Sequence, residues 1–195
     1  MLAERFKFLI STLEEHDIPV TQRAFSQIDT VQLQTLYPDV SLGLVDEIYH
    51  PIGTVEFTIN WPIGPLRVYP QDQLSKCQDG YGWTFDKPNK AWDFNKLVIA
   101  DLAADPISLD VNTGKIYHSV HGMRSWTFDE ICPDFEHYLK LLLHWVNVYY
   151  GTYNGNLFDD DLGITDNTLN AIQDRFLAAG FNAKHTEHIM RMVDS

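Results

Sequence analysis

Three aspartates and two histidines fall within a short central stretch of this 195-residue chain, where residues of these types could do acid–base or metal chemistry. Asp101, Asp105 and Asp110 would supply paired carboxylates for acid–base catalysis if one of them lay in an apolar pocket. Each of them also stands at a turn or at the end of a strand-like segment, where aspartate commonly bonds to the backbone. We therefore expect turn and edge roles for them and predict no catalytic residue.

The histidine pairs have a spacing typical of metal ligands but lack a third ligand nearby in the sequence. His118 and His121 would point to opposite faces of a strand, whereas His185 and His188 would share one face of a helix. Two imidazoles are too few for a zinc site. The sequence also contains no phosphate-loop, dinucleotide-binding or nucleophile-elbow motif. We predict no metal and no cofactor.

The charge balance restricts the classes of partner. The chain has 27 acidic and 14 basic residues, which gives a net charge of −13 and a pI near 4.8. This argues against direct binding of nucleic acid, which needs a basic patch, and is compatible with a basic protein partner. Only two cysteines occur, and no apolar run approaches the ~20 residues of a membrane span. The opening residues do not form a signal peptide, so we expect a cytoplasmic protein that does not enter membranes.

Apolar periodicity predicts helices at both ends of the chain and strands in the middle. A first helix is expected from about Leu2, and it stops before Pro19. A second is expected at 26–37, and a short helical turn should end before Pro51. The remaining expected helices are a brief one at 70–77, a long one at about 134–150 capped by Asp129, and a pair near 166–179 and 184–193. Gly180 follows the first helix of that pair, as a C-terminal glycine does.

The expected strands are "TVEFTINW", "GPLRVYP", "KLVIAD", "PISLDV" and "KIYHSV". "NTG" joins the last two, with Gly114 at a position that needs a positive φ. Residues 78–93 contain glycine, proline and three large aromatic side chains without a period, which predicts a structured loop. This order predicts an α+β fold with a mixed, mainly antiparallel sheet packed by helices. We assign residues 1–155 to this domain and 156–195 to a C-terminal helical extension.

The central text resembles the SUKH superfamily, which includes a fungal cell-wall-synthesis regulator and many bacterial immunity proteins. The family has a strand that enters an acidic turn, then "LD", a glycine turn, a strand, a histidine and a helix. Here these positions read "VIADLAADPISLD", "NTGKIYHSVHG" and "ICPDFEHYLKLLL". Upstream, "VYPQDQL" and "GYGW" are compatible with it, so the resemblance covers roughly residues 22–145.

The resemblance implies recognition rather than catalysis. Many bacterial members look like antidotes that bind and block a toxin from a competing cell, often a basic nuclease, and the acidity of this chain fits such a partner. We therefore expect a non-enzymatic immunity protein that neutralises a toxin through protein binding. The alternatives are a regulatory scaffold like the fungal relative and an unrecognised hydrolase that uses Asp101, Asp105 and His121.

Aromatic residues flanked by acids are the candidate partner-binding residues, because such side chains form interface hot spots. This predicted surface comprises Tyr81, Trp83, Trp92, Asp101, Asp105, His121 and Trp126. The alternative for each tryptophan is a place in the core. The sequence leaves the oligomeric state open.

Overall fold

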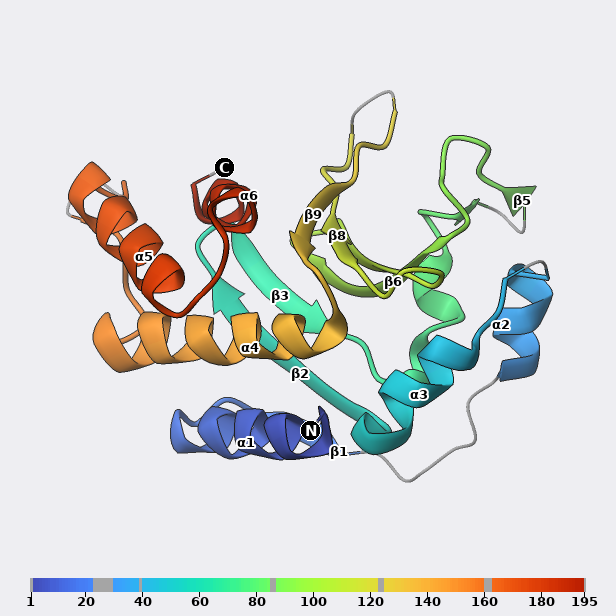
Figure 1. The fold of residues 1–195 in the computed structure, drawn as a ribbon, viewed down its shortest axis with the longest axis horizontal. Coiled ribbons are helices and arrows are strands. Elements are labelled where there is room, and N and C mark those ends of the chain that lie inside the picture. The colour runs from blue at the N-terminus through green and yellow to red at the C-terminus, as the bar shows by residue number, and fades with distance from the viewer. Residues whose placement is uncertain are drawn as a thin grey trace.

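The computed structural model describes residues 2–22, 30–38, 40–84, 87–122, 125–159 and 163–194. It shows the predicted α+β fold, in which helices pack against a seven-stranded sheet (Figure 1). The strand order is β1-β2-β3-β6-β7-β8-β9, and every neighbouring pair is antiparallel. Consecutive described strands therefore lie side by side, except where the small β4–β5 hairpin is inserted between β3 and β6.

The strands of the large sheet are short to medium in length. They are β1 (Val20–Gln22), β2 (Val55–Trp61), β3 (Gly64–Val68), β6 (Lys96–Leu102), β7 (Asp105–Asp110), β8 (Ile116–His118) and β9 (Asp129–Cys132). The separate hairpin consists of β4 (Trp83–Thr84) and β5 (Lys87–Pro88).

The helices come from both ends of the chain. They are α1 (Leu2–Glu15), α2 (Thr30–Leu36), α3 (Gly43–Ile52), α4 (Phe135–Val146), α5 (Asp166–Ala178) and α6 (Ala183–Val193). Two 3-10 turns, Gln71–Gln73 and Lys76–Gln78, replace the predicted brief helix, and a π-helical segment, Asn147–Thr152, extends α4.

Strand patterns follow the predicted burial. In β2, the apolar residues alternate with more exposed ones, so that Val55, Phe57 and Ile59 face the core. In β6, by contrast, almost every side chain is buried, because both faces of this central strand are covered. Gly114 has the predicted positive φ of 77°, in the turn between β7 and β8.

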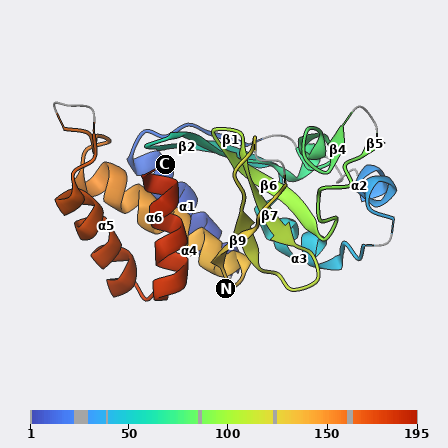
Figure 2. The same ribbon diagram turned by 90° about the horizontal axis from the view of Figure 1, so that it is seen from above.

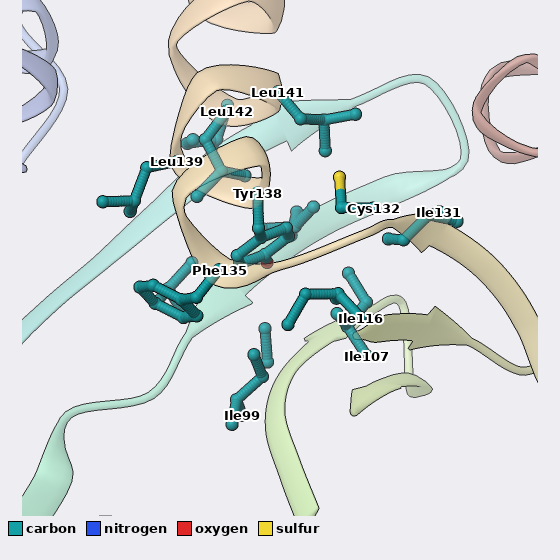
Figure 3. Close-up of a cluster of buried hydrophobic side chains, with 14 of the residues drawn as sticks. Ile99, Ile107, Ile116, Ile131, Cys132, Phe135, Tyr138, Leu139, Leu141 and Leu142 are labelled. Atoms are coloured by element: carbon teal, nitrogen blue, oxygen red, sulfur yellow. The ribbon is translucent and has the colours of Figure 1, made fainter. Parts of the chain in front are cut away.

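The core lies between the sheet and α4. Tyr138 and Leu142 of α4 are fully buried, and Figure 3 shows the side chains of this helix above Ile107 and Ile116 of the sheet. The helix buries a full apolar face because its aromatic and leucine residues recur at helical spacing. A shape-matched core of this kind holds the helix at one angle to the sheet.

Two predicted boundaries were wrong. Asp129 does not cap a helix, because residues 129–132 form the edge strand β9, and α4 begins only after Asp134, whose side chain accepts a hydrogen bond from the His137 amide. Helix α3 does not stop before Pro51, since it continues to Ile52. The predicted start of the second helix at residue 26 lies outside the described residues.

The C-terminal helices share the main core. The indole Nε1 of Trp61 donates to the carbonyl oxygen of Met192 at 2.7 Å, and the Trp61 ring stacks on Trp145 with centroids 4.0 Å apart. Helix α6 packs against β9 and against α5, and Figure 2 shows α5 on the outer side of α6. In the part of the chain that the structure describes, no helix is both long and apolar enough to span a membrane.

Candidate protein-binding surface

Four aromatic rings form one cluster against Lys96, at the start of β6. The rings of Tyr81, Trp126 and Phe128 surround Trp92, with centroids 5.9, 5.0 and 5.2 Å from the Trp92 ring respectively. Trp92 is only 4% exposed, whereas the three surrounding rings are half-buried. We call Tyr81, Trp126 and Phe128 the aromatic shelf. The edge-to-face arrangement of Trp92 with Trp126 and Phe128 is the favourable one for aromatic pairs.

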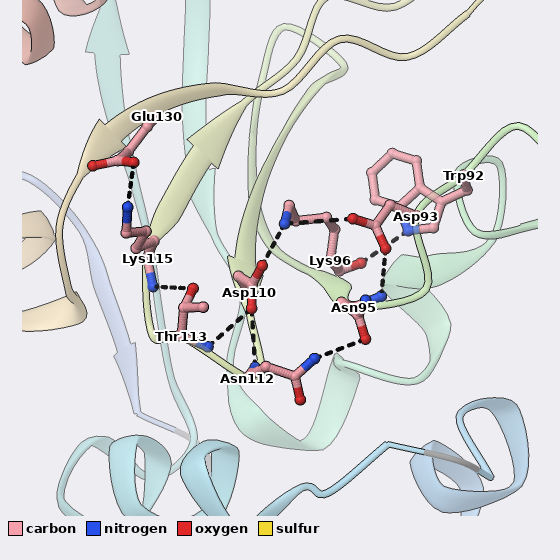
Figure 4. Close-up of polar contacts among 9 residues, drawn as sticks. All are labelled: Trp92, Asp93, Asn95, Lys96, Asp110, Asn112, Thr113, Lys115 and Glu130. Atoms are coloured by element: carbon pink, nitrogen blue, oxygen red, sulfur yellow. Dashed lines mark hydrogen bonds and ion pairs between the residues drawn. The ribbon is translucent and has the colours of Figure 1, made fainter.

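A buried lysine supports this shelf from beneath. Lys96 is 6% exposed, and its Nζ lies 2.5 Å from an Asp110 carboxylate oxygen and 3.5 Å from Asp93 (Figure 4). The same ammonium stands 4.2 Å from the ring centroid of Tyr117, a cation–π contact. The Lys96 carbonyl accepts a 2.8 Å hydrogen bond from the Trp92 indole, which fixes the ring at the centre of the cluster.

Asp110 links this pair to the turn that follows β7. Its other carboxylate oxygen accepts hydrogen bonds from the amides of Asn112 and Thr113, at 3.0 and 2.9 Å. Burial alone would raise the pKa of Asp110, but the hydrogen bonds from Lys96 and these amides outweigh it and lower the pKa below its ordinary value. Asp110 is therefore a structural carboxylate held in its charged form.

The β6–β7 turn supplies the acidic rim of the shelf. Asp101 accepts hydrogen bonds from the Tyr69 hydroxyl and the Ala104 amide, and the Tyr81 hydroxyl donates to the Ala104 carbonyl at 2.9 Å. Burial, together with the nearby charges of Asp101 and Asp105, raises the pKa of Tyr81 to about 12. The hydroxyl of Tyr81 thus lies in a negative field and stays protonated.

The turn itself is in an uncommon conformation. Ala103 and Ala104 have φ values of 52° and 75°, in the left-handed region that favours glycine or asparagine. The hydrogen bonds to Asp101 and from Tyr81 hold this tight two-residue connection against the strain.

Asp105 organises the loop after β8. It is 8% exposed, and one of its oxygens accepts from the His121 amide at 2.6 Å and lies 2.5 Å from the His121 Nδ1. The second oxygen lies 3.9 Å from Nε2 of the buried His118. Burial lowers the pKa of His118, against the opposing charges of Asp105 and Asp129. His118 is therefore neutral and inward-facing, while His121 is exposed.

The structure brings together five of the seven residues predicted for the partner-binding surface: Tyr81, Asp101, Asp105, His121 and Trp126. Trp92 lies beneath this surface and cannot itself offer much area to a partner. Trp83 lies apart from the cluster, edge-on to Phe94 at 6.2 Å, where it helps line a groove with Lys76 and Asp79.

Sequence reasoning missed Phe128, Tyr117 and Lys96. Lys96 and Val98 are two residues apart, so they share one face of an otherwise apolar strand. A lone lysine on such a face indicates that polar or aromatic side chains cover it. Phe128 was harder to identify. Its only indication in the sequence is that it follows Trp126 by two residues, so that both rings lie on the same side of an extended chain.

The histidines and acids form structural pairs. His185 bonds to Glu130 at 2.9 Å, and His188 lies 3.6 Å from Asp129, so the predicted helical pair holds α6 against β9. Among the described residues, no group of three or more histidine, cysteine or acidic side chains is arranged to hold a metal ion. Four grooves lined by described residues lie away from Asp101, Asp105 and His121.

Comparisons with known proteins returned no family model, no curated protein and no solved structure that matches this chain.

Proposed function

We propose that this chain is a non-enzymatic protein-binding module of the immunity type, which neutralises a basic toxin domain. The observation that carries the proposal is the aromatic shelf beside the carboxylates of Asp101 and Asp105, on a chain of net charge −13. Half-buried aromatic rings held rigidly in place lose little conformational freedom when a partner covers them, which is why such side chains dominate interface energetics.

The chemistry of the shelf suits a cationic side chain of the partner. The chain already uses the same recognition internally, since Lys96 lies over Tyr117 beside Asp110. Arg67 lies 5.4 Å from the ring centroid of Tyr69 while it bonds to Glu56 at 2.5 Å. A lysine or arginine of a partner would find the corresponding ring and carboxylate groups at Tyr81 and Asp101.

The net charge contributes mainly to the rate and selectivity of association. A nuclease or other phosphate-binding toxin must be basic, so its field attracts an acidic inhibitor over a distance set by the ionic strength. Salt is therefore expected to slow association more than it speeds dissociation.

The test is a pull-down with the tagged protein from a lysate that expresses the gene immediately upstream, at about 0.05 M and about 0.5 M salt. The proposal predicts a stable complex with a large protein that has a basic terminal domain, and weaker capture at the higher salt. If the tagged protein is monodisperse and no complex forms at either salt concentration, the proposal that the upstream gene encodes the toxin is contradicted.

Charge variants refine this test. Asp101→Asn removes one rim charge, and Asp46→Asn on α3 removes the same charge from an exposed position elsewhere. We expect Asp101→Asn to slow association severalfold more than Asp46→Asn, because nearby charges act most strongly. Equal association rates for the two variants would indicate that the net charge of the chain, and not the position of Asp101, determines the rate.

The contact between Asp105 and His121 favours one alternative, a hydrolase. A carboxylate that orients an imidazole forms two parts of a catalytic triad. Within the described part of the chain, the hydrogen bonds of His121 go to Asp105. Turnover of p-nitrophenyl acetate that His121→Ala abolishes would support the hydrolase, whereas background-level turnover by the wild-type protein would count against it.

A further inference from the structure

An open groove of about 420 Å³ runs between α1 and α4. Its lining residues are Glu4, Arg5 and Phe8 of α1 with Leu139, Lys140 and Leu143 of α4. The two helices pack closely along their lengths, so the groove is a surface feature above a tight helix pair. It does not belong to the aromatic shelf.

Phe8 is exposed without a role in the monomer core. The inward face of α1 is formed by Phe6, Leu9 and Leu13, which are 6%, 0% and 0% exposed, whereas Phe8 is 60% exposed. A phenylalanine in water on a helix that already has a complete buried face gains nothing for folding. Together with Leu143, it gives the groove an apolar wall on each helix.

The charges around the groove are already paired within the chain. The Nε of Arg5 lies 2.5 Å from a Glu136 carboxylate oxygen, and the Nζ of Lys140 donates to the Ala179 carbonyl at 2.6 Å. A partner that covers this surface would therefore not leave these cations buried and unpaired. The two acids Glu4 and Glu136 and the two cations sum to zero, whereas the whole chain carries −13.

We propose that the α1–α4 groove binds the same groove of a second copy of this chain, so that the protein forms a two-fold symmetric dimer. Two copies with a net charge of −13 repel each other, and they can approach closely only where the local charge is balanced. The four charged groups named here cancel, so they leave no local excess charge to attract a strongly basic or strongly acidic partner. A two-fold contact presents identical patches to each other, so the exposed Phe8 of each copy would cover the apolar wall of the other.

This dimer would leave the aromatic shelf free. Helix α1 and the loop that carries the β4–β5 hairpin lie on opposite sides of the molecule (Figure 1). Each copy of the dimer could then bind one partner through its own shelf.

The test is sedimentation equilibrium of the full chain from about 1 µM to about 1 mM. We expect a reversible monomer–dimer equilibrium, and Phe8→Glu should weaken dimerisation at least about tenfold, because it removes a central apolar contact and adds a charge. The matched control is Val120→Glu, which makes the same charge change at another exposed apolar residue, 48% exposed.

Three results would overturn the inference: a wild-type monomer at all concentrations, a Phe8→Glu dimer as stable as the wild type, or equal weakening by Val120→Glu. Since Phe8 faces outward, both variants should keep the wild-type circular dichroism spectrum. None of these outcomes depends on the identity of a toxin partner.

Discussion

Replacement of Lys96 by methionine tests whether the buried ion pair supports the aromatic shelf. The side chains of Lys96 and Asp110 are 8% and 11% exposed, and Lys96→Met removes the ammonium while it keeps most of the volume. Removing one partner of a buried ion pair typically costs 3–5 kcal/mol, because the other charge is left without compensation. Asp110 would keep two amide hydrogen bonds, so we expect the lower end, about 3 kcal/mol.

Urea unfolding measures this cost directly. With an m-value of about 2 kcal/mol/M, a loss of 3 kcal/mol lowers the unfolding midpoint by about 1.5 M. Asp110→Asn should cost less, since Lys96 retains Asp93 at 3.5 Å. The double variant Lys96→Met/Asp110→Asn should show a coupling energy of at least about 1 kcal/mol.

The control for this prediction is an exposed ion pair. Arg191 lies 2.6 Å from Glu187, with side chains 60% and 63% exposed, and Arg191→Met should cost less than about 1 kcal/mol. A Lys96→Met cost no larger than that of Arg191→Met would refute the reasoning, because it would show that burial of the pair has no consequence. An unchanged m-value is needed for the comparison, since it shows that the unfolded states are alike.

Three further predictions concern the histidine and turn residues. Burial lowers the pKa of His118 below its unfolded value near 6.5, so the neutral side chain contributes fully to stability above about pH 7. This contribution is lost as the pH falls below about 6.5. His118→Gln should flatten that part of a curve of unfolding free energy against pH. Ala104→Gly should stabilise the protein by roughly 0.5–1 kcal/mol in urea unfolding, because φ is 75° there. Gly64→Ala should lower the thermal midpoint and cost about 1–3 kcal/mol, since its new Cβ would lie 2.7 Å from the Cβ of Ala103 at a φ of 147°. A flat wild-type curve above pH 5, a destabilised Ala104→Gly or a neutral Gly64→Ala would contradict the respective argument.

Much of the fold could be predicted because the sequence has clear periods. The alternation in β2 and the apolar run of β6 identify their strands directly. The edge strand β9 could not be found this way, because it has four residues and only Ile131 and Cys132 are buried, which is too short for a period. Asp129 therefore resembled a helix cap, although the cap is Asp134.

The sequence predicted the turn residues of the candidate site, but it did not predict which aromatic side chains are buried and which are exposed. Asp101 and Asp110 accept hydrogen bonds from backbone amides, as their positions at turns indicate. The loop of residues 78–93 has no period, so nothing in the sequence distinguishes buried Trp92 from half-buried Trp83. The burial of Trp92 depends on Lys96 and Phe128, which contact it only after the sheet has formed.

The most direct test of the central claim is the dissociation constant for the captured partner, measured by calorimetry with the wild-type protein, Trp126→Ala and Leu177→Ala. Trp126 belongs to the shelf, whereas Leu177 is an exposed apolar residue of α5, 40% exposed. If the shelf is the binding surface, Trp126→Ala weakens binding by about 2 kcal/mol, or about 30-fold, and Leu177→Ala leaves it unchanged. Wild-type affinity in Trp126→Ala would contradict the claim and place the binding surface elsewhere on the molecule.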